Sequence, residues 1–67
     1  MREYTTEELT EARRQLASAL HKTQEVVKTF QAKENPDRYK SQITLALRRI
    51  AAFEISIALI DERLNTK

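Results

Sequence analysis

The sequence predicts an all-α fold, an antiparallel hairpin of two helices that dimerises into a four-helix bundle. The 67 residues include no Gly and a single Pro, whereas a β protein of this size needs several tight turns rich in Gly, Asn or Asp. Charged residues make up 33% of the chain, and with abundant Ala, Leu and Ile this composition favours helices. Apolar residues also recur at alternating steps of three and four along two segments, as they do in helices that pack together. Residues 1–67 are therefore expected to form one helical-hairpin domain.

The first helix is predicted over about residues 6–33. In the segment YTTEEL, Thr5 is placed as the N-cap and Glu8 as the N3 residue of a capping box. The side chains expected to face the second helix are Leu9, Ala12, Leu16, Ala19, Thr23, Val26 and Phe30, with Leu20 and Val27 widening this face along one edge. The Thr23 hydroxyl is expected to bond back to its own helix.

The segment KENPD predicts a turn over about residues 34–36. The residue before a proline is pushed out of helical geometry, and proline itself is accepted in the first turn of a helix. Asn35 then caps the second helix and Pro36 is its first residue. The alternative is one long helix kinked at Pro36.

The second helix is predicted over about residues 36–64, with its own regular inner face. The residues expected to face the first helix are Tyr39, Ile43, Ala46, Ile50, Phe53, Ile57, Ile60 and Leu64. Antiparallel pairing of two helices of similar length sets the expected register. In this register Phe30 meets Tyr39 and Ile43, Leu16 meets Phe53 and Ile57, and Leu9 meets Ile60 and Leu64.

The second helix has more apolar residues than one neighbour can cover. Eight of the ten residues in AAFEISIALI, positions 51–60, are apolar. Leu45, Ala52, Ile55 and Leu59 fall on a side away from the first helix, and we call these four residues the outer stripe. A second copy of the chain would bury them, giving a homodimer with the second helix innermost. A different protein could use the same surface.

Few residues in the sequence could carry chemistry. The chain has no Cys and one His, His21, which is expected to face solvent, so we expect no disulfide, metal site or cofactor. Glu54 interrupts the apolar segment and is expected to pair with Arg13 at the edge of the hairpin. A polar pocket between subunits, formed by Arg13, Arg49 and Glu54, is the hypothesis under which the protein is an enzyme.

The net charge of +2 is small, although the second helix begins with several basic residues. Arg38, Lys40, Arg48 and Arg49 are the candidate contacts to an anion or nucleic acid. The apolar segment is about half the ~20 residues that a membrane-spanning helix needs, which predicts a cytoplasmic protein with no membrane partner. The sequence favours a small non-enzymatic protein-interaction or regulatory module, with a nucleic-acid accessory protein as the alternative and an enzyme as a third possibility.

Overall fold

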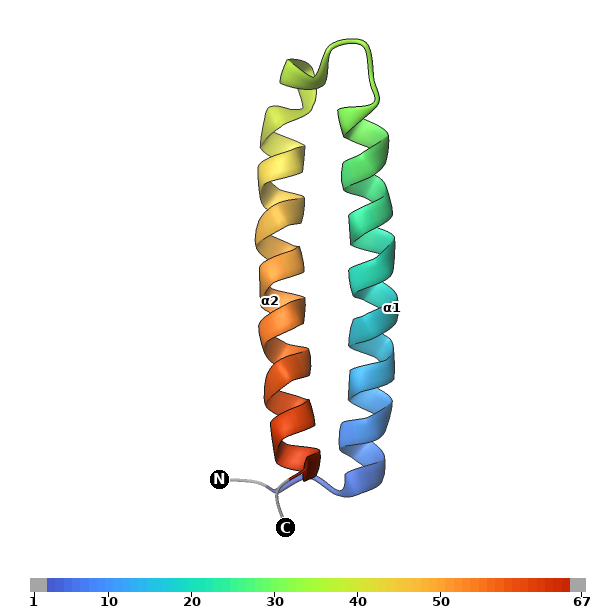
Figure 1. Cartoon of the computed structure of the whole chain (residues 1–67), viewed down its shortest axis with the longest axis vertical. Coiled ribbons are helices and arrows are strands. Elements are labelled where there is room, and N and C mark those ends of the chain that lie inside the picture. The colour runs from blue at the N-terminus through green and yellow to red at the C-terminus, as the bar shows by residue number, and fades with distance from the viewer. Residues whose placement is uncertain (1–2, 66–67) are drawn as a thin grey trace.

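The computed structural model describes residues 3–65 and, in this range, consists of two long helices and one short one. Helix α1 spans Thr6–Gln31, the 3-10 helix η1 spans Pro36–Tyr39, and helix α2 spans Lys40–Asn65. The two long helices run antiparallel along their whole length, joined at one end by the turn (Figure 1). The hairpin is a rod of 50 × 19 × 16 Å. The all-α hairpin predicted from the sequence is thus confirmed.

Helix α1 begins with the predicted capping box. The Glu8 backbone N–H donates to Thr5 Oγ1 at 3.1 Å, and the Thr5 backbone N–H donates to Glu8 Oε1 at 3.0 Å. The two bonds satisfy backbone donors that have no partner within a helix. Glu7 and Glu8 also place negative charge in the first turn, where the helix macrodipole favours it.

The chain reverses direction between Gln31 and Pro36, so the alternative of one kinked helix is excluded. Helix α1 ends at Gln31, and the Ala32 backbone N–H donates to the Lys28 carbonyl at 3.1 Å. Asn35 occupies the N-cap position of η1 with φ −123° but makes no capping bond with its side chain. The second helical segment therefore starts as a 3-10 turn at Pro36 and becomes an α-helix at Lys40.

The face that α2 turns toward α1 is the predicted one. Ala46 is buried, and the other seven predicted residues, from Tyr39 to Leu64, are half-buried. The rings of Phe30 and Tyr39 stack next to the turn with their centroids 5.0 Å apart. This contact fixes the expected pairing at that end of the hairpin.

The prediction for the inner face of α1 was partly wrong. Ala12 and Val26 are exposed, whereas Val27 is buried and Arg13 and Leu20 are half-buried. The helix is rotated so that the larger side chains on the neighbouring column face α2. Leu20 removes more apolar area from water than an alanine would, and the aliphatic stem of an arginine can lie along such an interface while its head stays polar.

The hairpin buries little of its surface. Val27 and Ala46, each 7% exposed, are the only buried residues in the described part of the chain. The accessible surface is 5682 Å², whereas a compact monomer of this mass is expected to expose about 4,400 Å². The excess reflects the shape, because a rod two helices thick has no interior layer.

Candidate interaction surface

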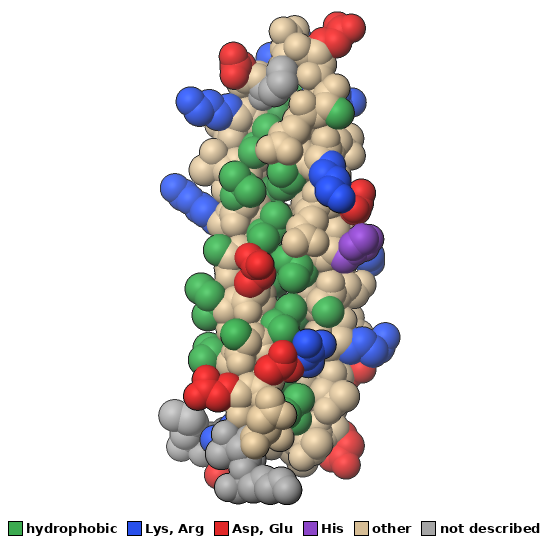
Figure 2. All heavy atoms as spheres, viewed as in Figure 1, with side chains coloured by type: hydrophobic (Ala, Val, Ile, Leu, Met, Phe, Trp, Pro, Cys, Tyr) green, Lys and Arg blue, Asp and Glu red, His purple; other side chains and the backbone are tan. Residues whose placement is uncertain are grey.

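The outer stripe is exposed along α2. Leu45, Ile55 and Leu59 have 50%, 62% and 61% of their surface accessible, and Ala52 is also exposed. Figure 2 shows hydrophobic side chains in the row between the helices and more of them along the outer edge of α2. Apolar residues that recur along one side of a helix differ from single exposed residues, which are common on any protein. The outer stripe is therefore an apolar surface that the hairpin leaves uncovered.

A groove between the helices extends the apolar surface onto α1. It has a volume of about 290 Å³ and its lining includes Leu45 from α2 and Val26 from α1, with Lys22 and Arg49 at its polar side. Val26 is 45% exposed. The place of Val26 in the groove was not predicted, because the spacing of apolar residues puts Val26 on the inner face. The signal that could have corrected it was the neighbouring Val27, which competes for the same position.

Arg13 is paired with Asp61, not with Glu54 as predicted. Arg13 Nε donates to Asp61 Oδ1, and Arg13 Nη2 donates to Asp61 Oδ2 at 3.1 Å. The hydrogen bonds and the positive charge of Arg13 lower the pKa of Asp61. In the predicted register, Leu9 lies opposite Ile60 and Leu64, and Leu16 lies opposite Phe53 and Ile57. Arg13 lies between Leu9 and Leu16 and is then nearer Asp61 than Glu54, so the register could have indicated this partner.

The proposed polar pocket is not assembled within one hairpin. Arg13 lies across from Asp61, twelve residues and therefore about 18 Å along α2 from Arg49. Arg49 lines the groove near the turn, and Glu54 is exposed between these two positions. Any convergence of Arg13, Arg49 and Glu54 would need a second chain.

The basic residues at the start of α2 are exposed, but they do not gather on one side. Arg38 lies in η1, and Lys40 begins α2. Arg48 and Arg49 follow each other, so their side chains leave the helix about 100° apart. Acidic residues Glu34 and Asp37 lie next to them in the sequence.

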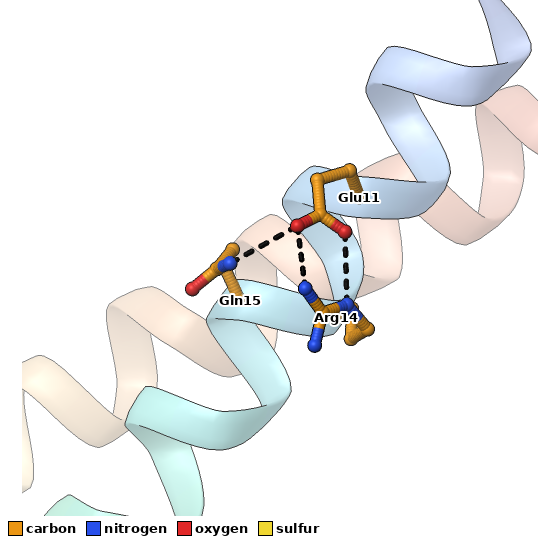
Figure 3. A network of polar contacts seen from close by, with 3 residues as sticks. All are labelled: Glu11, Arg14 and Gln15. Carbon is orange, nitrogen blue, oxygen red and sulfur yellow. Dashed lines mark hydrogen bonds and ion pairs between the residues drawn. The ribbon is translucent and has the colours of Figure 1, made fainter.

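A polar network on the outside of α1 is local to that helix. Glu11 accepts hydrogen bonds from Arg14 at 2.8 and 2.6 Å and from Gln15 at 3.1 Å (Figure 3). These bonds lower the pKa of Glu11 to about 2. Thr23 Oγ1 donates to the Ala19 carbonyl at 2.8 Å, as predicted. Both features join residues within α1, and neither forms a site.

The charges of the hairpin are divided between its two ends. The half that contains the turn, residues 18–53, has seven basic and three acidic residues, a net charge of +4. The rest of the sequence, residues 1–17 and 54–67, has five basic and seven acidic residues, a net charge of −2. Each hairpin is therefore a rod with a basic end and an acidic end.

Residues 3–65 contain neither a metal-binding cluster nor a membrane-spanning helix. No group of three or more His, Cys, Asp or Glu residues in this range could hold a metal ion. Neither α1 nor α2 is long and apolar enough to cross a membrane. His21 lies on the exposed side of α1.

Comparison with known proteins did not identify a relative. No protein-family model, curated protein or solved structure matches the chain.

Proposed function

We propose that the protein is a small non-enzymatic interaction module that associates through the outer stripe of α2. The partner that binds this surface is a second copy of the chain. In the resulting homodimer the two α2 helices lie innermost and the two α1 helices outside, which completes a four-helix bundle.

The observation that carries the proposal is the exposure of the outer stripe on a hairpin with almost no interior. Full burial of a Leu or Ile side chain contributes roughly 1.5–3 kcal/mol. Leu45, Ile55 and Leu59 are at least half exposed, so each would add about 1 kcal/mol when a partner covers it. A second chain supplies the packing layer that two helices lack.

The size of the surface also fits this proposal. The long face of the hairpin measures 50 by 19 Å, which is comparable to the ~800 Å² that each partner buries in a standard interface. The excess accessible surface described above is of the same order. A contact of this size can hold a stable dimer.

The two other candidate functions have less support. A nucleic-acid surface would need Arg38, Lys40, Arg48 and Arg49 to act together, and Arg48 and Arg49 point in different directions. An enzyme would need Arg13 and Arg49 in one pocket, and Arg13 is bound by Asp61. The outer stripe needs no rearrangement of the hairpin.

The proposal is tested by sedimentation equilibrium of three proteins at about 1–100 µM, a range around typical dimer affinities. The wild type is expected to have twice the 7.8 kDa mass of one chain. Ile55→Asp should weaken the dimer by at least about 100-fold, because it places a charge in the interface. Leu47→Asp is the matched control, since Leu47 is 50% exposed but lies off the outer stripe.

Each outcome of this experiment decides the proposal. A concentration-dependent dimer that Ile55→Asp disrupts and Leu47→Asp preserves supports it. A wild-type chain that is folded and monomeric throughout the range overturns it, and so does a dimer that Leu47→Asp disrupts as strongly as Ile55→Asp. Circular dichroism of each variant checks that the helices remain formed.

A further inference from the structure

The outer stripe belongs to a longer line of residues with heptad spacing. Continuing the alternating steps of three and four in both directions gives a line of seven exposed positions on α2, namely Ser41, Leu45, Arg48, Ala52, Ile55, Leu59 and Glu62. This is the spacing of a coiled-coil interface. The line contains one basic and one acidic residue, placed on either side of its apolar centre.

The position of these two charges distinguishes the possible orientations of a second α2. In a parallel pair each residue meets its own copy, so Arg48 meets a second Arg48 and Glu62 a second Glu62. In an antiparallel pair, Arg48 of one chain is brought toward Glu62 of the other, and this contact occurs twice. Like charges at an interface are unfavourable and opposite charges select a partner orientation.

The charge distribution of the whole hairpin favours the same orientation. The turn half, residues 18–53, has a net charge of +4, and the rest of the sequence has a net charge of −2. Two parallel hairpins would place ends of equal charge together. Two antiparallel hairpins place each basic end beside an acidic end, which also increases the rate of association.

Along most of α2 the basic residues come before the acidic ones. Arg48 and Arg49 precede Asp61 and Glu62, although the last turn also contains the basic residue Arg63. Arg48 and Arg49 lie outside the first and last turns, where the helix macrodipole acts, so the macrodipole does not account for their place. Pairing with an antiparallel second α2 gives this order a physical role.

We infer that two copies dock antiparallel through α2, with the basic turn end of each hairpin against the acidic end of the other. This inference rests on the self-association proposed above. Alternating heptad positions then form layers in which Ala52 opposes Ile55 of the partner subunit and Leu45 opposes Glu62 of the partner subunit. Arg48 opposes Leu59 of the partner subunit and reaches the partner's Glu62 one turn further on.

The orientation is tested by measuring a distance across the dimer. The chain has no native Cys, so Thr44→Cys, at an exposed position beside the stripe, accepts a single spin label. The pairing above separates the two labels by 19 residues along the axis, about 28 Å. A parallel dimer would place them at the same level, separated by roughly the 8–10 Å between helix axes plus the length of the labels.

A charge exchange provides the second measurement. Arg48→Glu should weaken the dimer about tenfold at low salt, because two attractive contacts become repulsive. The double variant Arg48→Glu with Glu62→Arg should return the dissociation constant to within about threefold of the wild type. In a parallel dimer residue 48 meets its own copy, so the contact is repulsive in the wild type and in both variants. Arg48→Glu would then cause no tenfold loss, and there would be nothing for the double variant to rescue.

The outcomes separate this inference from the proposed function. A long distance between the labels together with rescue by the double variant supports antiparallel docking. A dimer with a short distance, or without rescue, overturns the orientation and leaves self-association intact. A monomeric wild type overturns both.

Discussion

Helices α1 and α2 have the same length, 26 residues, but they differ in how their ends and faces are built. α1 has a capping box and acidic residues in its first turn. α2 follows a 3-10 turn whose N-cap residue Asn35 makes no side-chain capping bond, and its first turn has no acidic residue. Both helices have a basic residue in the last turn, Lys28 and Arg63. α1 is therefore stabilised by its own sequence, while α2 depends more on what surrounds it.

The two helices also differ in where their apolar residues lie. On α1 most of the apolar side chains face α2, and Val26 is the largest exception. On α2 one face meets α1, and Leu45, Ile55 and Leu59 are exposed on another. A helix with apolar residues on two sides occupies the centre of an assembly, and a helix with one apolar side occupies its edge. This difference is the reason for proposing that α2 is the inner helix of the dimer and α1 the outer one.

The largest expected effect is on the stability of the hairpin, and it is measured by comparing substitutions of two alanines on different faces of α2. Ala46 is 7% exposed against α1, so Ala46→Glu should destabilise the hairpin by at least about 3 kcal/mol through a buried charge without a partner. Ala52 lies on the outer stripe, so Ala52→Glu should retain the helices and lose the dimer. Circular dichroism at high concentration measures the first effect, and sedimentation measures the second. Equal loss of helix in both variants would contradict the assignment of the two faces.

A smaller effect is expected at the starts of the two helical segments. Thr5→Ala removes the 3.1 Å bond from the Glu8 backbone N–H and should lower the free energy of unfolding by about 1 kcal/mol. Asn35→Ala is the matched control, because Asn35 makes no side-chain capping bond, and it should change stability by less than about 0.5 kcal/mol. Urea unfolding of both variants measures the difference. A cost at Asn35 equal to that at Thr5 would show that the second segment is capped after all.

The smallest effect is a pH dependence that arises mostly on α1. Hydrogen bonds from Arg14 and Gln15 lower the pKa of Glu11 from 4.5 to about 2. Because the folded pKa lies below the unfolded one, the stabilisation is present above about pH 4.5 and is lost as the pH falls toward 2. Asp61 has its pKa lowered by Arg13 and contributes with the same sign. Glu11 is exposed and Asp61 is only half-buried, so solvent screening keeps the effect small.

Thermal unfolding between pH 5 and pH 2, roughly the range in which carboxylates titrate, measures this dependence. Glu11→Gln should reduce the loss of stability on acidification, because it removes the carboxylate whose pKa is lowered. An NMR titration of the Glu11 carboxyl provides an independent check. A midpoint near 4.5 would show that the contacts with Arg14 and Gln15 do not persist in solution.

The sequence by itself determined the two helices, the break at Pro36, the cap at Thr5 and the inner face of α2. The helices, the break and the cap depend on interactions between residues close in the chain. The inner face of α2 depends on the apolar residues from Tyr39 to Leu64, whose alternating steps of three and four are regular throughout. The outer stripe was predicted from the same heptad spacing, because its residues lie on a different side of the helix from the inner face. Local periodicity was sufficient for each of them.

Only the tertiary structure decided which column of α1 faces α2 and which acid binds Arg13. The sequence offers two adjacent columns, one with Ala12 and Val26 and the other with Leu20 and Val27, and a helix reaches either by a rotation of about 100° or less. Glu54 and Asp61 are one heptad apart on the same side of α2, so both fit the helical pattern. Packing across the hairpin selects between such alternatives, because it compares the volume and reach of side chains that are far apart in the chain.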